Sequence, residues 1–137
     1  MFTLASYYPL YASLCSEEQA KKLVEKLSLV ECQYGIACCE PGKAKLNLQW
    51  DYPNGWACLQ YIVIKGLLNY GYTEDALRIA QKYVDIIEKI YNETGYLWEK
   101  YNVVTGTIAE SESHRAYEMV GWSAGIYLFC LKLLGKF

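Results

Sequence analysis

Two helical segments of this 137-residue chain are apolar on nearly every side, a pattern typical of helices buried inside a larger helical assembly. We expect them at residues 53–70 and 118–134. Each follows a segment that has one polar face, at residues 16–29 and at residues 73–92. The first of these opens with a capping box formed by Ser16 and Gln19. The chain therefore alternates outer, inner, outer and inner helices.

The connection between the second and third segments is short and contains Gly71, which predicts an αα-hairpin. Hairpins repeated in a ring form an α/α toroid. We therefore expect an all-α fold with four main helices in two hairpins, which is a partial α/α toroid, an incomplete version of the six-hairpin α/α barrel. The two inner helices should be the most buried. No internal repeat or linker is visible, so residues 1–137 are expected to form a single domain.

The composition argues against several classes of protein. Apolar residues make up 53% and charged residues 20% of the chain, as in globular proteins. The net charge of -2 comes with no basic patch, so we expect no nucleic-acid partner. The most apolar run, residues 119–131, is shorter than the roughly 20 residues that span a bilayer, so we expect no membrane insertion. Without a basic n-region at the N-terminus, we expect no signal peptide and a cytoplasmic location.

The cysteines and the single histidine show no metal-site pattern. None of the six cysteines forms a C-x-x-C pair, and structural zinc needs closely spaced ligands. We therefore expect neither a metal nor a cofactor. Six cysteines would allow disulfides, but a cytoplasmic protein keeps its thiols reduced.

The densest group of polar and aromatic side chains spans residues 49–57, with the sequence Gln-Trp-Asp-Tyr-Pro-Asn-Gly-Trp-Ala. It lies at the predicted start of the first inner helix. The chain as a whole has 14 tyrosines, 4 tryptophans and 3 phenylalanines. Flat apolar rings with a polar tip suit sugars, although they also suit any protein core. The aromatic content alone favours carbohydrate binding only slightly.

This segment resembles the trehalase signature, in which glutamine-tryptophan-aspartate is followed by proline, a small residue, tryptophan and another small residue. Four more segments resemble the family in the same order along nearly the whole chain. They are Tyr8-Pro9-Leu10, Tyr34-Gly35-Ile36-Ala37, Glu99-Lys100-Tyr101-Asn102-Val103 and Gly121-Trp122-Ser123-Ala124-Gly125. The chain is thus similar to the C-terminal part of a trehalase catalytic domain.

The resemblance implies an α/α toroid that hydrolyses α,α-trehalose with inversion, which needs a carboxylic acid and a carboxylate base on opposite faces of the scissile bond. The family's base is the glutamate of the glutamate-lysine-tyrosine segment, which is Glu99 here. On local sequence alone, Glu99 would instead be an exposed residue on an edge segment. The resemblance also implies a set of sugar-binding residues, for which the alternative is packing in the core: Gln49, Trp50, Asp51, Asn54, Trp56 and Trp122.

The chain departs from the family pattern at two points. Nine residues before the tryptophan of its last helix the family has a glutamate after a glycine-rich run, whereas this chain has Ser113 and no such glycines. Glu112 is either the substitute that contacts the second sugar or part of a solvated acidic loop. The family's general acid, an aspartate, and its sugar-binding arginines lie upstream and have no counterpart here. Losing the acid alone removes about 10² to 10⁴ in rate.

Three interpretations of function follow. The first is the C-terminal portion of a trehalase-like glycoside hydrolase acting on α,α-trehalose or a related α-glucoside, competent only with an N-terminal trehalase-like polypeptide. The second is a non-catalytic helical module that binds a sugar or a protein. The third is a glycosidase of related fold with another α-glucoside substrate. In each case the apolar inner helices of a partial ring need cover, so we expect a homodimer.

Overall fold

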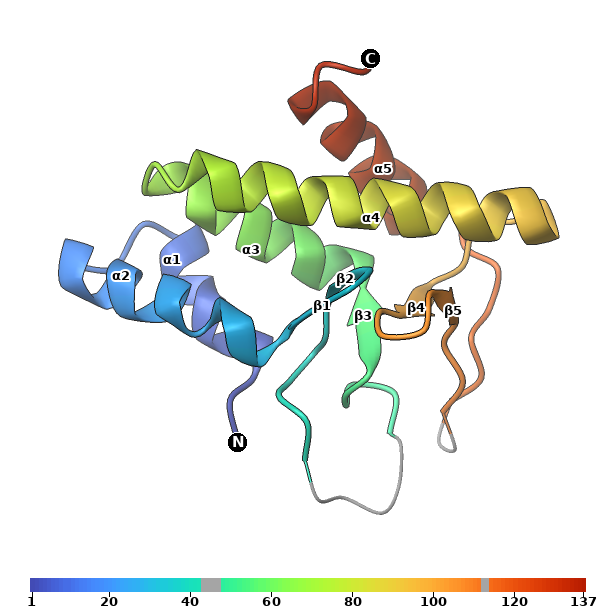
Figure 1. The fold of residues 1–137 in the computed structure, drawn as a ribbon, viewed down its shortest axis with the longest axis horizontal. Helices are drawn as coiled ribbons and strands as arrows, with labels where there is room; N and C mark the ends of the chain where they lie inside the picture. Colours follow the sequence, from blue (N-terminus) through green and yellow to red (C-terminus); the bar gives the residue numbers. More distant parts are fainter. Residues whose placement is uncertain (43–47, 112–113) are drawn as a thin grey trace.

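The computed structural model describes residues 1–42, 48–111 and 114–137 (Figure 1). Its α-helices are α1 (Tyr8–Tyr11), α2 (Glu17–Glu25), α3 (Ala57–Asn69), α4 (Thr73–Thr94) and α5 (Gly121–Leu133). Two 3-10 turns, η1 (Leu4–Tyr7) and η2 (Leu27–Leu29), flank α1 and α2. The described strands are β1 (Glu31–Cys32), β2 (Gly35–Ile36), β3 (Asn54–Trp56), β4 (Lys100–Asn102) and β5 (Thr107–Ile108).

The amphipathic helices form where the sequence predicts them. The Ser16 hydroxyl accepts a hydrogen bond from the Gln19 amide, and the Gln19 side chain accepts one from the Ser16 amide, so the predicted capping box opens α2. The helix ends earlier than expected, and the remainder of residues 16–29 forms η2. Helix α4 ends at Gly95, whose φ of 77° is a left-handed cap.

Helix α3 is the centre of the core, as its apolar sequence predicts. It packs against α1, α4 and α5, and buries Leu59, Val63, Ile64 and Leu67. With α4 it forms the expected hairpin, closed at Gly71 with a φ of 79°. The predicted start at residue 53 is wrong, because residues 54–56 form β3 and pair with β4. A backbone that bonds across a sheet cannot also make the bonds of a helical turn.

The expectation of an all-α fold is wrong in this respect, because the described residues also form two small antiparallel sheets. One is the β1–β2 hairpin, and the other has the order β3-β4-β5. The strands lie on one side of the α3–α4 layer (Figure 1). They are two or three residues long, and three of their side chains, those of Ile36, Trp56 and Tyr101, belong to the hydrophobic core.

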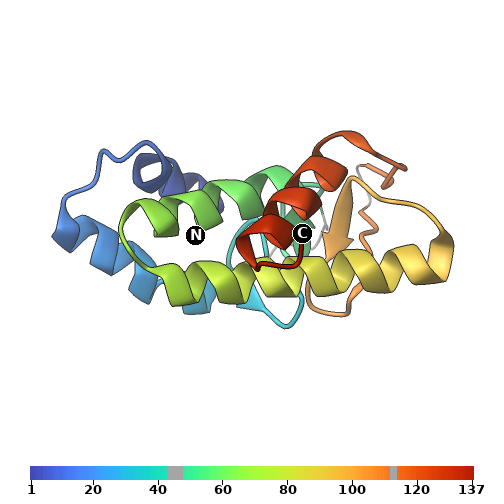
Figure 2. The same ribbon diagram turned by 90° about the horizontal axis from the view of Figure 1, so that it is seen from above.

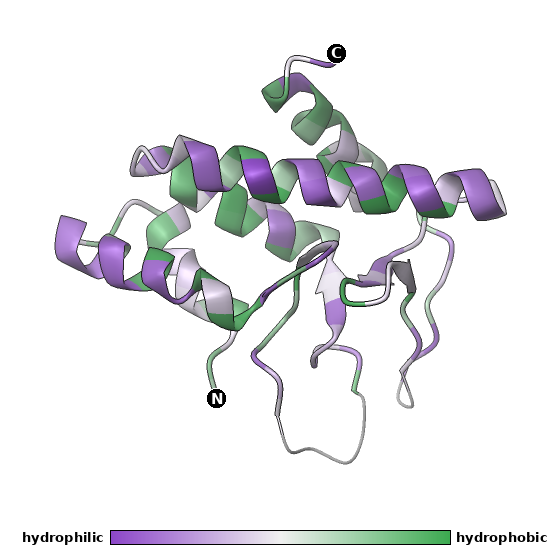
Figure 3. Cartoon of the chain, in the orientation of Figure 1, coloured by the Kyte–Doolittle hydropathy of each residue, from purple (hydrophilic) through white to green (hydrophobic). Residues whose placement is uncertain are grey.

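The prediction that the last helix would be among the most buried is also wrong. Helix α5 lies across α3 and α4 when seen from above (Figure 2). Its residues are largely hydrophobic (Figure 3), yet only Ser123 and Cys130 are buried. Leu128 is 45% exposed, and Val120, just before the helix, is 75% exposed. One side of α5 packs on the core, and the described residues leave the other side uncovered.

The β1–β2 hairpin is tied to α4 by an ion-pair cluster around Glu31. The Arg78 guanidinium donates to both oxygens of the Glu31 carboxylate, at 2.9 Å each. The Lys82 ammonium lies 2.6 Å from Glu31 Oε1 and 2.8 Å from the Cys32 carbonyl oxygen. Burial raises the pKa of the Glu31 carboxyl, but these hydrogen bonds outweigh that effect and the net pKa is lowered.

Two further expectations concern cysteines and membranes. All six thiols are free, as expected for reduced cysteines. Within the described ranges, no helix combines the length and the apolar sequence that crossing a bilayer requires.

Candidate active site

The pairing of β3 with β4 brings together two segments that are far apart in the sequence. Asn54 lies opposite Asn102, Gly55 opposite Tyr101, and Trp56 opposite Lys100. The approach is close at Gly55, where an added Cβ would lie 2.4 Å from Val103 Cγ1. Only glycine fits at that point of β3. The signature segment at residues 49–57 is thereby held against the segment that carries Glu99.

Aromatic rings gather around Trp56 at this junction. Trp50 stacks on Trp56 with ring centroids 4.0 Å apart and planes at 12°, and Trp122 meets Trp56 edge-on at 5.6 Å and 90°. The Trp56 indole nitrogen donates to the Gln49 carbonyl oxygen at 2.8 Å. Trp56 is buried, whereas Trp50 is 46% exposed. The cluster therefore has an inner core and one ring that faces solvent, an arrangement that suits a sugar ring.

Glu99 is buried beside this cluster, with a relative exposure of 6%. Its Oε1 lies 2.8 Å from Nε2 of His114, and its backbone amide donates to the Tyr117 carbonyl oxygen at 3.0 Å. The reading of Glu99 as an exposed residue on an edge segment is therefore wrong. Buried carboxylates are costly unless they are hydrogen-bonded, and they concentrate at functional sites.

Lys100 anchors the chain at Ser111 and His114. Its side chain is fully buried, and its ammonium donates to Ser111 Oγ at 2.8 Å and to the His114 carbonyl oxygen at 2.6 Å. The ammonium also lies 5.6 Å from the centroid of a Trp56 ring. Burial lowers the pKa of the Lys100 ammonium, and the neighbouring Glu99 carboxylate opposes this shift. Lys100 thus links the aromatic cluster to the loop that carries His114.

The other candidates of the signature segment have structural contacts. Asn54 is fully buried, and its side-chain nitrogen donates to the Leu48 and Gln49 carbonyl oxygens at 2.9 and 3.4 Å. The backbone of Asp51 closes a turn, bonding to Leu48 and Asn54. Asn54 and Asp51 thereby shape the loop that presents Trp50.

The two remaining candidates lie beyond β5. Trp122, in the first turn of α5, is half-buried, and its buried Nε1 has no hydrogen-bond partner among the described residues. Glu112, the candidate for the second sugar, lies outside the described residues.

The sequence does not identify three residues of this arrangement as parts of the site, namely Lys100, Ser111 and His114. His114 stands out only as the single histidine of the chain, in a run without local periodicity. Its contact with Glu99 depends on how the loop folds back, which no local pattern records.

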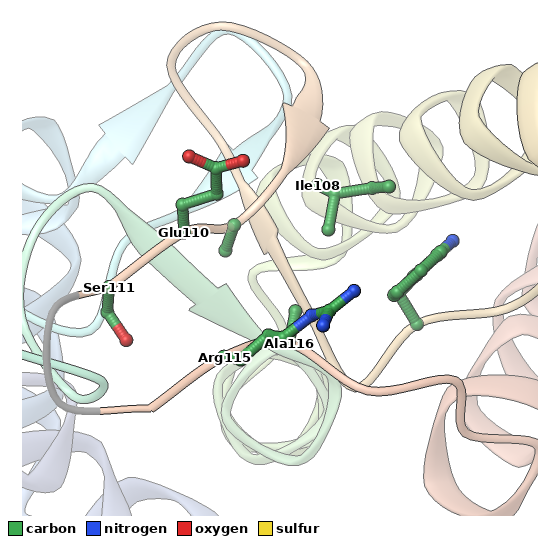
Figure 4. A pocket seen from close by; sticks show the side chains of 7 residues that line it. Ile108, Glu110, Ser111, Arg115 and Ala116 are labelled. Atoms are coloured by element: carbon green, nitrogen blue, oxygen red, sulfur yellow. The ribbon is translucent and has the colours of Figure 1, made fainter.

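A separate hollow lies beside the site (Figure 4). It has a volume of about 450 Å³ and is lined by Trp98, Ile108, Ala109, Glu110, Ser111, Arg115 and Ala116. Neither Glu99 nor Trp56 lines it. The aromatic cluster and the carboxylate therefore do not open into this pocket.

In the part of the chain that the structure describes, no group of three or more histidine, cysteine, aspartate or glutamate residues could hold a metal ion.

Comparison with known proteins identifies one family. A family model described as Trehalase matches residues 1–135. The chain is 30% identical over 158 residues to a cytosolic neutral trehalase of Kluyveromyces lactis, which covers 98% of the chain and 20% of that protein. It is 31% identical over 133 residues to a periplasmic trehalase of Salmonella choleraesuis, covering 96% of the chain and 23% of that protein.

Solved structures agree with these relatives. A neutral trehalase of Saccharomyces cerevisiae superimposes with a TM-score of 0.80 and 31% identity, over 96% of this chain and 23% of that one. A mannosylglycerate hydrolase of Thermus thermophilus in complex with glucose has the same fold over 98% of this chain and 31% of its own, with a TM-score of 0.71 and 21% identity.

The chain spans about a fifth of the length of the curated relatives given above. Within that span, the family model covers almost every residue and the fold superimposes on a trehalase. The chain therefore belongs to the trehalase family.

Proposed function

We propose that this chain supplies the general base of a trehalase-like glycoside hydrolase, with Glu99 as the base and α,α-trehalose or a related α-glucoside as the substrate. The observation that carries the proposal is the buried Glu99 carboxylate, which lies 2.8 Å from the imidazole of His114, whose ring is in turn 6.5 Å from that of Trp56. An inverting glycosidase needs a carboxylate that takes a proton from the attacking water. A carboxylate already removed from bulk solvent and hydrogen-bonded in place suits that step.

The sugar-binding side of the site is formed by the aromatic cluster. The exposed ring of Trp50 is the stacking surface, and Trp56 supports it from behind. Trp122 supports Trp56 through their edge-on contact. Asn54 acts by holding the loop that carries two further candidates for sugar contacts, Gln49 and Asp51. Glu112 is the candidate for a contact with the second sugar.

The general acid and the arginines that grip the sugar come from residues beyond this sequence, in an N-terminal trehalase-like polypeptide. In inverting glycosidases the two carboxyl groups lie roughly 6.5–9.5 Å apart, so the acid must face Glu99 across the bound sugar. The described fold would then be one part of an α/α toroid, and residues 1–137 would form a single structural unit within it. The uncovered side of α5 is consistent with further helices in the complete ring.

Glucose release from trehalose tests this proposal. The purified chain alone should release none above background, and adding the upstream polypeptide should restore activity. In the restored system, Glu99→Gln should lower kcat by at least about 10²-fold, because the amide cannot accept the proton. The matched control is Glu118→Gln, at an exposed residue directly after Tyr117. Full activity in Glu99→Gln would exclude the assigned base, and strong Glu99-dependent activity of the chain alone would show that it contains its own acid.

A non-catalytic helical module is the second candidate, and the exposed apolar side of α5 favours it. Val120 and Leu128 are available to a protein partner, and a second copy of this chain is the simplest one. A cytoplasmic location, which we also propose, is consistent with six free thiols. Relatives of this chain are named for both cytosolic and periplasmic locations. A soluble homodimer that neither binds an upstream polypeptide nor hydrolyses α-glucosides would support the module.

A further inference from the structure

We propose that His114 is the positioning residue for Glu99, which its imidazole holds as an oriented carboxylate. The proposal rests on the assignment of Glu99 as the base and adds a second residue to the same site. His114 lies where the chain departs from the family pattern, directly after Ser113, which stands in place of the family's glutamate. The contact is therefore a feature of this chain's own loop.

The geometry of the contact gives each atom a role. His114 Nε2 and Glu99 Oε1 are 2.8 Å apart, which is hydrogen-bond distance. An ionised carboxylate can only accept, so Nε2 carries the hydrogen and donates it. A charge-assisted bond of this kind fixes the orientation of the carboxylate. With Oε1 occupied by the imidazole, Oε2 is the oxygen left to take a proton from water.

The imidazole is held by its surroundings on several sides. Its ring lies 6.5 Å from Trp56 with planes at 27°, and it meets Tyr117 edge-on at 5.4 Å and 64°. The His114 carbonyl oxygen accepts from the Lys100 ammonium and from the Ser111 hydroxyl. The loop is thus anchored at the residue that carries the ring, so Nε2 stays directed at Glu99. Among the described residues, the Glu99 carboxylate contacts the imidazole itself, and the Lys100 ammonium contacts the backbone carbonyl of the same residue.

Side-chain NMR tests the contact directly in the full chain. Because His114 is the only histidine, its ring signals are unique and need no assignment. We expect a downfield Nε2–H proton protected from exchange with water in the wild type. The signal should be lost in Glu99→Ala and retained in Glu118→Ala, the control on the exposed neighbouring segment. Absence of the signal from the wild type, or its persistence in Glu99→Ala, would overturn the proposal.

Kinetics then test the role of the contact in the active assembly of this chain with the upstream polypeptide. Losing a hydrogen bond to a charged group should lower kcat between about 10-fold and 100-fold in His114→Ala, with little change in KM. His114→Gln should recover most of the loss, because its amide can donate to the same oxygen. A purely structural role predicts no such rescue. Circular dichroism on both variants checks that they fold.

The outcomes separate this inference from the proposed function. Unchanged kcat in His114→Ala, together with a large loss in Glu99→Gln, would refute the positioning role and leave the base in place. If no combination with an upstream polypeptide hydrolyses an α-glucoside, the proposed function fails. In that case the NMR experiment still decides whether His114 donates to Glu99.

Discussion

The Gly55→Ala substitution tests the close packing that joins the two halves of the site. The added Cβ would lie 2.4 Å from Val103 Cγ1, 3.0 Å from the Ile36 carbonyl oxygen and 3.1 Å from Gln60 Nε2. The carbonyl belongs to the backbone of β2 and cannot turn away. Overpacking of this kind costs about 1–3 kcal/mol. Since one contact is far inside van der Waals distance and a second is rigid, we expect the upper part of that range, about 2–3 kcal/mol.

Thermal unfolding measures the effect. For a chain of this length, 1 kcal/mol corresponds to about 4 °C in Tm, so Gly55→Ala should lower Tm by about 8–12 °C. The matched control is Gly125→Ala in α5, where an added Cβ would meet nothing within 4 Å. In a helix interior that change should stabilise by about 0.5–1 kcal/mol and raise Tm by about 2–4 °C.

A second substitution identifies the clash itself. Val103→Ala removes the methyl group that Gly55→Ala would strike, so the double variant should be more stable than the sum of the two single effects by about 1 kcal/mol or more. A Tm of Gly55→Ala within about 2 °C of the wild type would refute the reasoning, because β3 and β4 would then not approach as closely as their register implies.

Two further predictions concern the ion-pair cluster and the apolar helix. The lowered pKa of Glu31 means that its carboxylate stabilises the fold above the ordinary carboxyl pKa of about 4.3, and that this contribution is lost as pH falls through the folded-state value. Thermal unfolding midpoints measured from about pH 6 down to about pH 3, the range in which carboxyl groups titrate, should therefore fall more steeply in the wild type than in Glu31→Gln. Equal slopes for the two proteins would contradict the prediction. The isolated chain should sediment as a dimer and Leu128→Glu as a monomer, because Leu128 lies on the uncovered side of α5. A wild-type species of 15.7 kDa that binds no apolar dye would contradict that expectation.

Much of the helical framework could be predicted from local sequence. The Ser16 capping box, Gly71 in the α3–α4 connection and the apolar sequence of α3 each act within a few residues, and the structure confirms all three. The burial of α5 could not be predicted in the same way. A sequence that is apolar all round shows which surface a helix could bury, whereas the packing of neighbouring elements decides which surface is buried. Among the described residues, α5 has neighbours on one side only.

In the candidate site, too, some features follow from local sequence and others from tertiary contacts. The segment at residues 49–57 stands out locally as a compact run of distinctive residues, whereas Glu99 was singled out by the resemblance of residues 99–103 to the trehalase family. Their meeting depends on the pairing of β3 with β4, and strands of three residues are too short to show a period in the sequence. The partnership of Glu99 with His114 depends on a loop held by the buried Lys100 ammonium. Such contacts exist only once the chain has folded, since they join residues that no local periodicity connects.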